Sequence, residues 1–146
     1  MVSNWDARFI SMTEVVGSWS KDRSTKIGCV IVGNDNSILS TGFNGFPRGI
    51  DDNVDYRHER PEKYIWTEHA ERNAIYNAAR NGVRLAGSRI YCSWFPCSDC
   101  ARAIIQSGIT SIMCDAPDYS NKQWGSSFFT SWKMMIEADV EIRYVS

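Results

Sequence analysis

Residues 89–114 read RIYCSWFPCSDCARAIIQSGITSIMC, and they give the clearest indication of the fold. The apolar run from Arg89 to Phe95 predicts a buried strand, and Thr110 to Cys114 predicts another. Between them, Cys97 to Ser107 has the spacing of a helix that a proline precedes and a glycine follows. A strand, a helix and a second strand in this order predict a parallel crossover.

The sequence on either side of this unit predicts more helices and strands. Apolar residues at spacings of 4, 3, 4 and 3 predict a first helix with one buried face, made of Trp5, Phe9, Met12, Val16 and Trp19. Asn4 is a suitable cap for that helix. We further expect strands over residues 27–33, 37–43 and 140–145, and helices over residues 68–81 and 126–138.

The order of these elements predicts an α/β fold in one domain, residues 1–146. The first two strands flank an Asn-Asp-Asn turn and form an antiparallel hairpin, whereas each later strand follows a helix and is expected to be parallel. We therefore expect a five-stranded mixed sheet with helices on both faces. Residues 44–66 show no periodicity, and a loop that long inside a small domain is usually functional.

Composition and charge exclude several classes of protein. The chain has 146 residues, 43% of them hydrophobic and 23% charged, with a net charge of −1. These values exclude a mostly disordered chain and disfavour binding to long nucleic acids. We find no apolar run long enough to cross a membrane and no signal-peptide pattern at the N-terminus, so we expect a cytoplasmic protein. Five cysteines, an odd number, argue against a disulfide framework.

Two short motifs carry the chemistry, and each opens a predicted helix. His69-Ala70-Glu71 begins one helix, and Cys97 and Cys100 share a face at the start of another. The positive end of a helix favours thiolates there. One imidazole and two thiolates suit a tetrahedral zinc ion with one open position, and Glu71 is better placed to carry protons than to bind metal.

Simpler readings of these motifs compete with a catalytic zinc site. The C-x-x-C pair can be a redox pair, although a proline precedes it and an H-x-E motif accompanies it. A structural zinc site needs a fourth ligand. The candidates are poor, because His58 lies in the long loop and three cysteines lie in predicted strands, where we expect small buried side chains: Cys29, Cys92 and Cys114.

H-x-E followed by P-C-x-x-C, with 24 residues between Glu71 and Pro96, is similar to the signature of zinc-dependent nucleobase deaminases. The resemblance implies the three-layer cytidine deaminase-like fold. It also implies that His69, Cys97 and Cys100 hold zinc, which lowers the pKa of a bound water. Glu71 then takes the water's proton and passes it to ring nitrogen N3. Hydroxide attacks C4 of cytosine, and ammonia leaves.

Three further segments resemble deoxycytidylate deaminases, which convert dCMP to dUMP in pyrimidine deoxynucleotide metabolism. These segments are SKDRSTKIGCVIV (20–32), STGFNGFPRGIDDN (40–53) and FPCSDCARAIIQSGI (95–109). In the second, Phe43 replaces the family's usual tyrosine. The resemblance implies that the backbone N–H of Ala70 holds the base carbonyl and that a backbone carbonyl in residues 94–96 receives the amino group. The needs of a nucleotide agree, because Asn44 can offer a donor and an acceptor to a sugar 3′-hydroxyl, and Arg23, Ser24, Lys26 and Tyr119 can meet a 5′-phosphate. The alternatives are a solvated surface turn for Arg23 and Lys26 and a residue that caps its own loop for Asn44.

Many members of that family are homohexamers that dCTP activates and dTTP inhibits, each with magnesium. For this chain the resemblance implies a regulatory nucleotide at the Gly-rich segment. Gly45 and Gly49 allow the backbone to approach a nucleotide, and Asp51 or Asp52 can bind Mg²⁺. The alternative is a flexible turn with a solvated acidic pair. Some viral members carry a second zinc, but residues 44–67 contain only His58 and no cysteine, so we expect one zinc per chain.

Three other functions remain open from the sequence. A deaminase of single-stranded nucleic acid needs basic and aromatic surface near its pocket, whereas this chain has a net charge of −1. A deaminase of a nucleoside, a free base or another cytosine nucleotide does not need the contacts predicted for the phosphate. A structural zinc module keeps the metal without any turnover.

Overall fold

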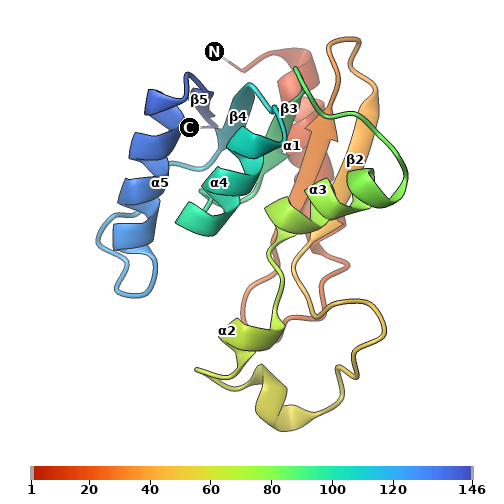
Figure 1. Cartoon of the computed structure of the whole chain (residues 1–146), viewed down its shortest axis with the longest axis vertical. Coiled ribbons are helices and arrows are strands. Elements are labelled where there is room, and N and C mark those ends of the chain that lie inside the picture. The colour runs from red at the N-terminus through yellow and green to blue at the C-terminus, as the bar shows by residue number, and fades with distance from the viewer. Residues whose placement is uncertain (1, 146) are drawn as a thin grey trace.

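Five strands form one mixed sheet, in the order β2-β1-β3-β4-β5 (Figure 1). The structure is a computed structural model that describes residues 2–145. Its elements, in chain order, are α1 (Asn4–Gly17), β1 (Gly28–Val32), β2 (Ile38–Phe43), the 3₁₀ helix η1 (Asp55–His58), α2 (Lys63–Trp66), α3 (Ala70–Arg80), β3 (Arg89–Cys92), α4 (Ser98–Gln106), β4 (Ser111–Cys114), α5 (Gly125–Glu137) and β5 (Glu141–Tyr144).

The pairing of the strands confirms the predicted mixed sheet. β1 pairs antiparallel with β2, as the predicted hairpin requires, and also antiparallel with β3. β3, β4 and β5 are mutually parallel, because each is reached through a helix that returns the chain to the same end of the sheet. The parallel crossover predicted from residues 89–114 is therefore correct, although β3 ends at Cys92 rather than at Phe95.

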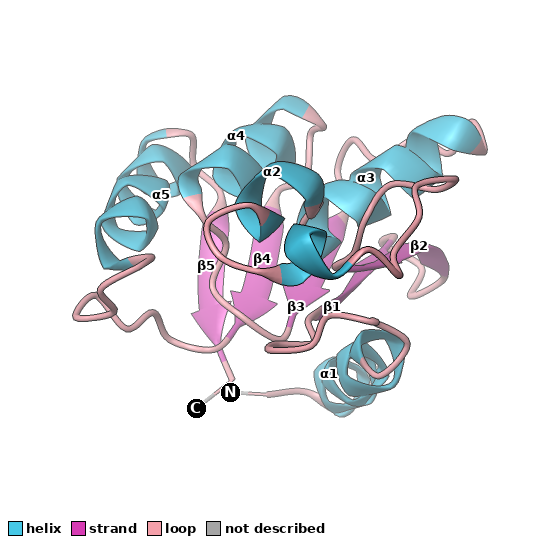
Figure 2. Ribbon diagram, turned by 90° about the horizontal axis from the view of Figure 1, so that it is seen from below, coloured by secondary structure: helices cyan, strands magenta, loops and turns pink. Residues whose placement is uncertain are grey.

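Helices cover both faces of the sheet (Figure 2). α1 lies on one face, where Phe9 and Val16 pack against Val30 and Val32 of β1. α3, α4 and α5 lie on the other face and enclose the larger core, which includes Ile31 and apolar residues of all three helices. Within residues 2–145, no helix combines the length and the apolar character needed to cross a membrane.

The first helix differs from its prediction at both ends. Ser3 rather than Asn4 is the cap, and it forms a reciprocal pair with Asp6: the hydroxyl accepts from the Asp6 N–H while the Asp6 carboxylate accepts from the Ser3 N–H. α1 ends at Gly17, so Trp19 lies outside the helix and is 54% exposed. Trp5, predicted to be buried, is 45% exposed because it lies against the Arg8 guanidinium and only the edge of the core at Phe9.

The long segment after β2 contains two short helices that the sequence did not predict. η1 and α2 project from the rest of the molecule in Figure 1. Aromatic packing holds them: the Phe46 ring lies 4.7 Å from the His58 ring, and the Arg57 guanidinium lies 4.1 Å from the centre of the Trp66 ring. These contacts join residues too far apart in the chain to produce a periodic pattern, which is why the sequence showed none.

Candidate active site

Helix α3 brings His69 and Glu71 together at its first turn. His69 is the cap residue, with an extended backbone, and Glu71 lies in the first turn with its side chain buried. The predicted helix start at residues 68–69 is thus correct to within two residues. Because the first N–H groups of a helix have no acceptor within it, this end of α3 also presents free donors, the Ala70 N–H among them.

A glycine in β2 lets α3 approach the sheet closely. A Cβ atom on Gly42 would lie 2.3 Å from the backbone N of Ala74 and 2.5 Å from the backbone O of Ala70. Both distances are far shorter than van der Waals contact, so no larger residue fits without moving α3. The position of Glu71 relative to the sheet therefore depends on the absence of a side chain at residue 42.

Helix α4 brings two thiols to the same place. Cys97 is the cap of α4 and Cys100 lies in its first turn. Nδ1 of His69 is 3.4 Å from Sγ of Cys97 and 3.5 Å from Sγ of Cys100. Two ligands of a tetrahedral zinc ion, with bond lengths of roughly 2.0 Å to nitrogen and 2.3 Å to sulfur, lie roughly 3.5 Å apart. The three side chains thus fit one zinc ion without rearrangement.

The charges around these groups favour a bound cation. The hydrogen bond from Cys100, helped by His69, lowers the pKa of the Cys97 thiol to about 4. Burial opposes the charged form of His69, but the contacts with Cys97 and Glu71 outweigh it and raise the pKa of the imidazole. The Arg72 guanidinium lies 3.6 Å from Sγ of Cys100, where it offsets negative charge on that sulfur. Cys97 is therefore the thiol that ionises first, whereas burial raises the pKa of the Cys100 thiol.

Glu71 has an unusual environment for a carboxylate. Burial raises its pKa above the ordinary value. Its Oε1 lies 3.6 Å from Sγ of Cys29, which in turn is 3.0 Å from Sγ of Cys92 on the neighbouring strand. All five cysteines are buried free thiols, and burial raises the pKa of both Cys29 and Cys92. Those two cysteines thus form neutral packing behind Glu71, as expected for small buried residues.

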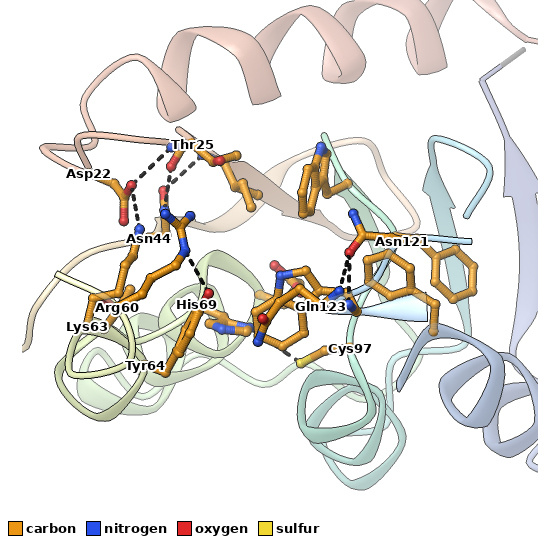
Figure 3. Close-up of a pocket in the computed structure, with 17 residues that line it drawn as sticks. Asp22, Thr25, Asn44, Arg60, Lys63, Tyr64, His69, Cys97, Asn121 and Gln123 are labelled. Atoms are coloured by element: carbon orange, nitrogen blue, oxygen red, sulfur yellow. Dashed lines mark hydrogen bonds and ion pairs between the residues drawn. The ribbon is translucent and has the colours of Figure 1, made fainter. Parts of the chain in front are cut away.

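His69, Glu71 and Cys97 line a pocket of about 290 Å³ (Figure 3). Asn44, at the end of β2, lies in the same pocket. Its Nδ2 donates to the Thr25 carbonyl and its Oδ1 accepts from the Ile27 N–H, which fixes the amide and leaves one donor hydrogen and one lone pair free. Aromatic rings complete the walls, with Trp124 packed edge-on against both His69 and Tyr64.

The comparison with known families identifies the chain. Residues 3–116 match the model of the cytidine and deoxycytidylate deaminase zinc-binding region. The chain belongs to this deaminase family. The match includes the H-x-E and P-C-x-x-C motifs and all of the pocket except the wall after β4. A protein of this family is a zinc-dependent hydrolase, so a zinc ion bound by the three side chains described above would serve catalysis.

Relatives of the chain have names from the same family. A protein of Aliivibrio fischeri named "Uncharacterized deaminase in luxG 3'region" is 44% identical over 147 residues, or 99% of this chain and 96% of the relative. A "Probable deoxycytidylate deaminase" of Caenorhabditis elegans is 43% identical over 108 residues, or 72% of this chain and 54% of the relative. The chain thus aligns with about half the length of the nematode protein.

Among solved structures, the chain is similar to dCMP deaminase from the cyanophage S-TIM5, in a complex with dCMP and dUMP. The TM-score is 0.80, the alignment covers 99% of both chains, and the identity is 23%. At that identity the likeness shows the fold alone. It confirms the predicted cytidine deaminase-like architecture.

Four residues predicted to contact phosphate lie outside the pocket of this deaminase. Arg23 forms an ion pair with Asp55, Lys26 is exposed, and Tyr119 is 46% exposed and packs edge-on against Phe129. Ser24, on the same exposed turn as Arg23, donates its backbone N–H to a neighbouring aspartate. None of the four lines the pocket, so their role as phosphate contacts stays a prediction.

A second cavity, of about 420 Å³, opens at the Gly-rich segment of this deaminase. Gly45, Gly49 and Asp52 line it, whereas Asp51 does not; the Asp51 carboxylate accepts from the backbone N–H of Asn53. Asp52 is paired with Lys21. The predicted regulatory residues are thus brought near one another, apart from Asp51.

The pocket also contains residues that the sequence analysis missed. Three of them come from the segment of η1 and α2, and three from the loop after β4: Arg60, Lys63, Tyr64, Asn121, Gln123 and Trp124. The sequence predicts irregular loops for both segments. No motif or period in the sequence distinguishes these side chains, because only the folded chain brings the two loops to the same pocket.

Proposed function

We propose that this chain catalyses the zinc-dependent hydrolytic deamination of dCMP to dUMP with release of ammonia. The observation that supports it best is the convergence of His69 Nδ1, Cys97 Sγ and Cys100 Sγ, all within 4.8 Å of one another, beside the buried Glu71 in a pocket. A relative named for deoxycytidylate deamination and a similar structure crystallised with dCMP and dUMP support this choice of substrate.

His69, Cys97 and Cys100 would hold the zinc ion. Zinc supplies a Lewis acid that makes water nucleophilic near neutral pH. The candidate proton carrier is Glu71, whose raised pKa suits a group that must both take and give a proton. It would accept a proton as water adds to C4 and deliver it to N3. It would then accept the proton of the new C4 hydroxyl and deliver that one to the departing amine. Arg72 would limit the negative charge that two thiolates bring to the site.

The remaining contacts orient the base and the sugar. The Ala70 N–H, in the first turn of α3, would donate to the base carbonyl, and a backbone carbonyl in residues 94–96 would accept from the amino group. The free donor and acceptor of Asn44 would bind the sugar 3′-hydroxyl. Arg23, Ser24, Lys26 and Tyr119 remain proposed contacts of the phosphate, provided that their exposed side chains turn toward the pocket when nucleotide binds.

Regulation by dCTP and dTTP with Mg²⁺ belongs to the same proposal. The second cavity supports it, because Asp22, Asn44 and Thr67 line both cavities. In addition, Gly45 and Glu68 exchange backbone hydrogen bonds of 2.8 and 3.1 Å, which connects the Gly-rich segment to the residue before His69. A nucleotide held by Gly45, Gly49 and Asp52, with Asp51 or Asp52 on Mg²⁺, would thus lie against residues that also line the first pocket.

We also propose that the chain is a single domain that assembles into a homo-oligomer, a hexamer by family resemblance, in the cytoplasm. Light scattering on the purified protein, with and without dCTP and Mg²⁺, measures the mass of the assembly. A monomer under all conditions would contradict the hexamer, and it would leave the proposed reaction to be judged by turnover alone.

The proposed reaction is tested by incubating the zinc-loaded protein with dCMP and following the loss of cytosine absorbance. Deoxycytidine, dCTP and a cytosine-containing oligonucleotide are the competing substrates. Each reaction is repeated with dCTP and Mg²⁺ or dTTP and Mg²⁺, since an enzyme that needs an activator would otherwise look inactive. Turnover of dCMP well above the rest is expected. Equal or higher turnover of the oligonucleotide or of deoxycytidine would contradict the proposed substrate.

A further inference from the structure

One wall of the pocket carries two cations that come from the segment of η1 and α2 (Figure 3). Arg60 precedes α2 and Lys63 begins it, and Tyr64 follows directly. All three line the pocket together with His69 and Asn44. A pocket for a neutral nucleoside has no need of two cations, so the charge of this wall requires an explanation.

Lys63 is already balanced by a carboxylate. Its Nζ lies 3.2 Å from Oδ1 of Asp22, and both side chains are nearly buried, at 11% and 7% exposure. The same oxygen accepts the backbone N–H groups of Ser24 and Thr25. Burial alone would raise the pKa of Asp22, but these three donors outweigh it and lower it. The pair is therefore ionised and neutral overall, and it ties α2 to the segment before β1.

Arg60 is the cation that remains. Its Nε donates to the Tyr64 hydroxyl at 2.7 Å, and within residues 2–145 no carboxylate lies within ion-pair distance of it. Tyr64 is itself held edge-on against Trp124, so the guanidinium is supported from one side. Its two terminal nitrogens stay available as a planar fork of donors, the geometry that binds phosphate through two hydrogen bonds. Arg60 and Asn44 line the same pocket (Figure 3).

We infer that Arg60 recognises the 5′-phosphate of the nucleotide substrate, with Tyr64 as the positioning residue that holds its guanidinium. The inference rests on the proposed function. With the base at His69 and Glu71 and the sugar at Asn44, the phosphate meets this wall. Arg60 is exposed like Arg23 and Lys26, but it already lines the pocket, whereas those two would have to turn toward it. The net charge of the wall, with Lys63 neutralised by Asp22, is that of Arg60.

The test compares dCMP with deoxycytidine as substrates of Arg60→Ala, Arg60→Lys and Tyr64→Phe. We expect Arg60→Ala to lower kcat/KM for dCMP on the order of 10- to 100-fold and to leave that for deoxycytidine nearly unchanged. Arg60→Lys restores part of the loss, because it keeps charge without the fork. Tyr64→Phe raises KM for dCMP with little effect on kcat. Arg84→Ala, at an exposed arginine outside the pockets, is the matched control.

Two results would overturn the inference. One is an equal loss for both substrates in Arg60→Ala, which would indicate a structural role. The other is an unchanged preference for dCMP in Arg60→Ala together with a lost preference in Arg23→Ala or Lys26→Ala.

A binding experiment tests this inference independently of the proposed reaction. Calorimetric titration with dUMP and deoxyuridine measures the affinity gained from the phosphate, without turnover. If wild type binds dUMP more tightly and Arg60→Ala removes that gain, the inference holds even if dCMP is not deaminated. If wild type binds the two equally, the inference fails whatever the turnover.

Discussion

Glu71 differs from an ordinary surface glutamate in every contact that it makes. It is buried, its Oε1 lies 3.6 Å from the neutral Cys29 thiol, and it lies close enough to the His69 imidazole to help raise the pKa of that ring. A raised pKa at such a position is typical of a group that exchanges protons during a reaction.

The first prediction concerns this carboxyl group. Glu71→Gln keeps the size and polarity of the side chain but cannot accept a proton, so we expect turnover to fall about 10²- to 10⁴-fold with zinc content unchanged. Metal analysis and steady-state kinetics on the same sample measure both. Glu137→Gln, on the exposed face of α5, is the control. Unchanged turnover in Glu71→Gln would remove Glu71 from the mechanism.

The second prediction concerns the metal ligands. Cys97→Ala removes a thiolate whose lowered pKa shows that it is the more easily ionised of the pair, so we expect loss of stoichiometric zinc and a lower melting temperature. Cys114→Ala is the matched control, since Cys114 is equally buried but lies outside the cluster. It is expected to lose stability and keep zinc. Stoichiometric zinc in Cys97→Ala would show that the ligand assignment is wrong.

At the scale of elements, the contact between α3 and β2 positions the site. The third prediction is that Gly42→Ala pushes α3 away from the sheet and destabilises the fold by about 1–3 kcal/mol, because the new Cβ would overlap the backbone of Ala70 and Ala74. We expect turnover to fall too, since Glu71 moves with the helix. Urea unfolding measures the stability. Gly45→Ala, where no atom lies within 4 Å of the added Cβ, is expected to unfold like wild type.

At the scale of the whole molecule, one carboxylate joins the two ends of the chain. Asp6 in α1 accepts two hydrogen bonds of 3.0 Å from Arg143 of β5 and one of 2.5 Å from the Tyr91 hydroxyl of β3. Burial acts to raise the pKa of Asp6, but these donors and those of Ser3 outweigh it and hold the pKa well below the ordinary value. The ionised form is therefore the one that stabilises the fold.

The fourth prediction follows from the sign of that shift. A carboxyl group with a lowered pKa in the folded state contributes its full stability above its unfolded pKa, about 4, and loses it as the pH falls further. We expect Asp6→Asn to be less stable than wild type by about 2 kcal/mol at pH 7, with the difference shrinking at pH 3. Urea unfolding at both pH values measures it. A difference that stays constant would show that Asp6 does not titrate with folding.

Much of the fold could be predicted because its information is local. Helical spacing and strand alternation extend over a few residues, and so do the proline and glycine that bound α4, so these elements were correct to within a few positions. The prediction for the buried face of α1 was partly wrong for the converse reason. Whether Trp5 and Trp19 are buried depends on which parts of the fold pack against them, and the period of the helix does not contain that information.

The family and the candidate metal ligands could be read from the sequence alone, because H-x-E and C-x-x-C each combine a ligand spacing with a helix start within a few residues. Only the tertiary structure decided what surrounds that chemistry. Arg60, Lys63 and Tyr64 reach the pocket because their segment is tied to the chain before β1, through contacts such as Lys63 with Asp22, 41 residues apart. Contacts at that separation follow no period, so no local pattern in the sequence predicts them.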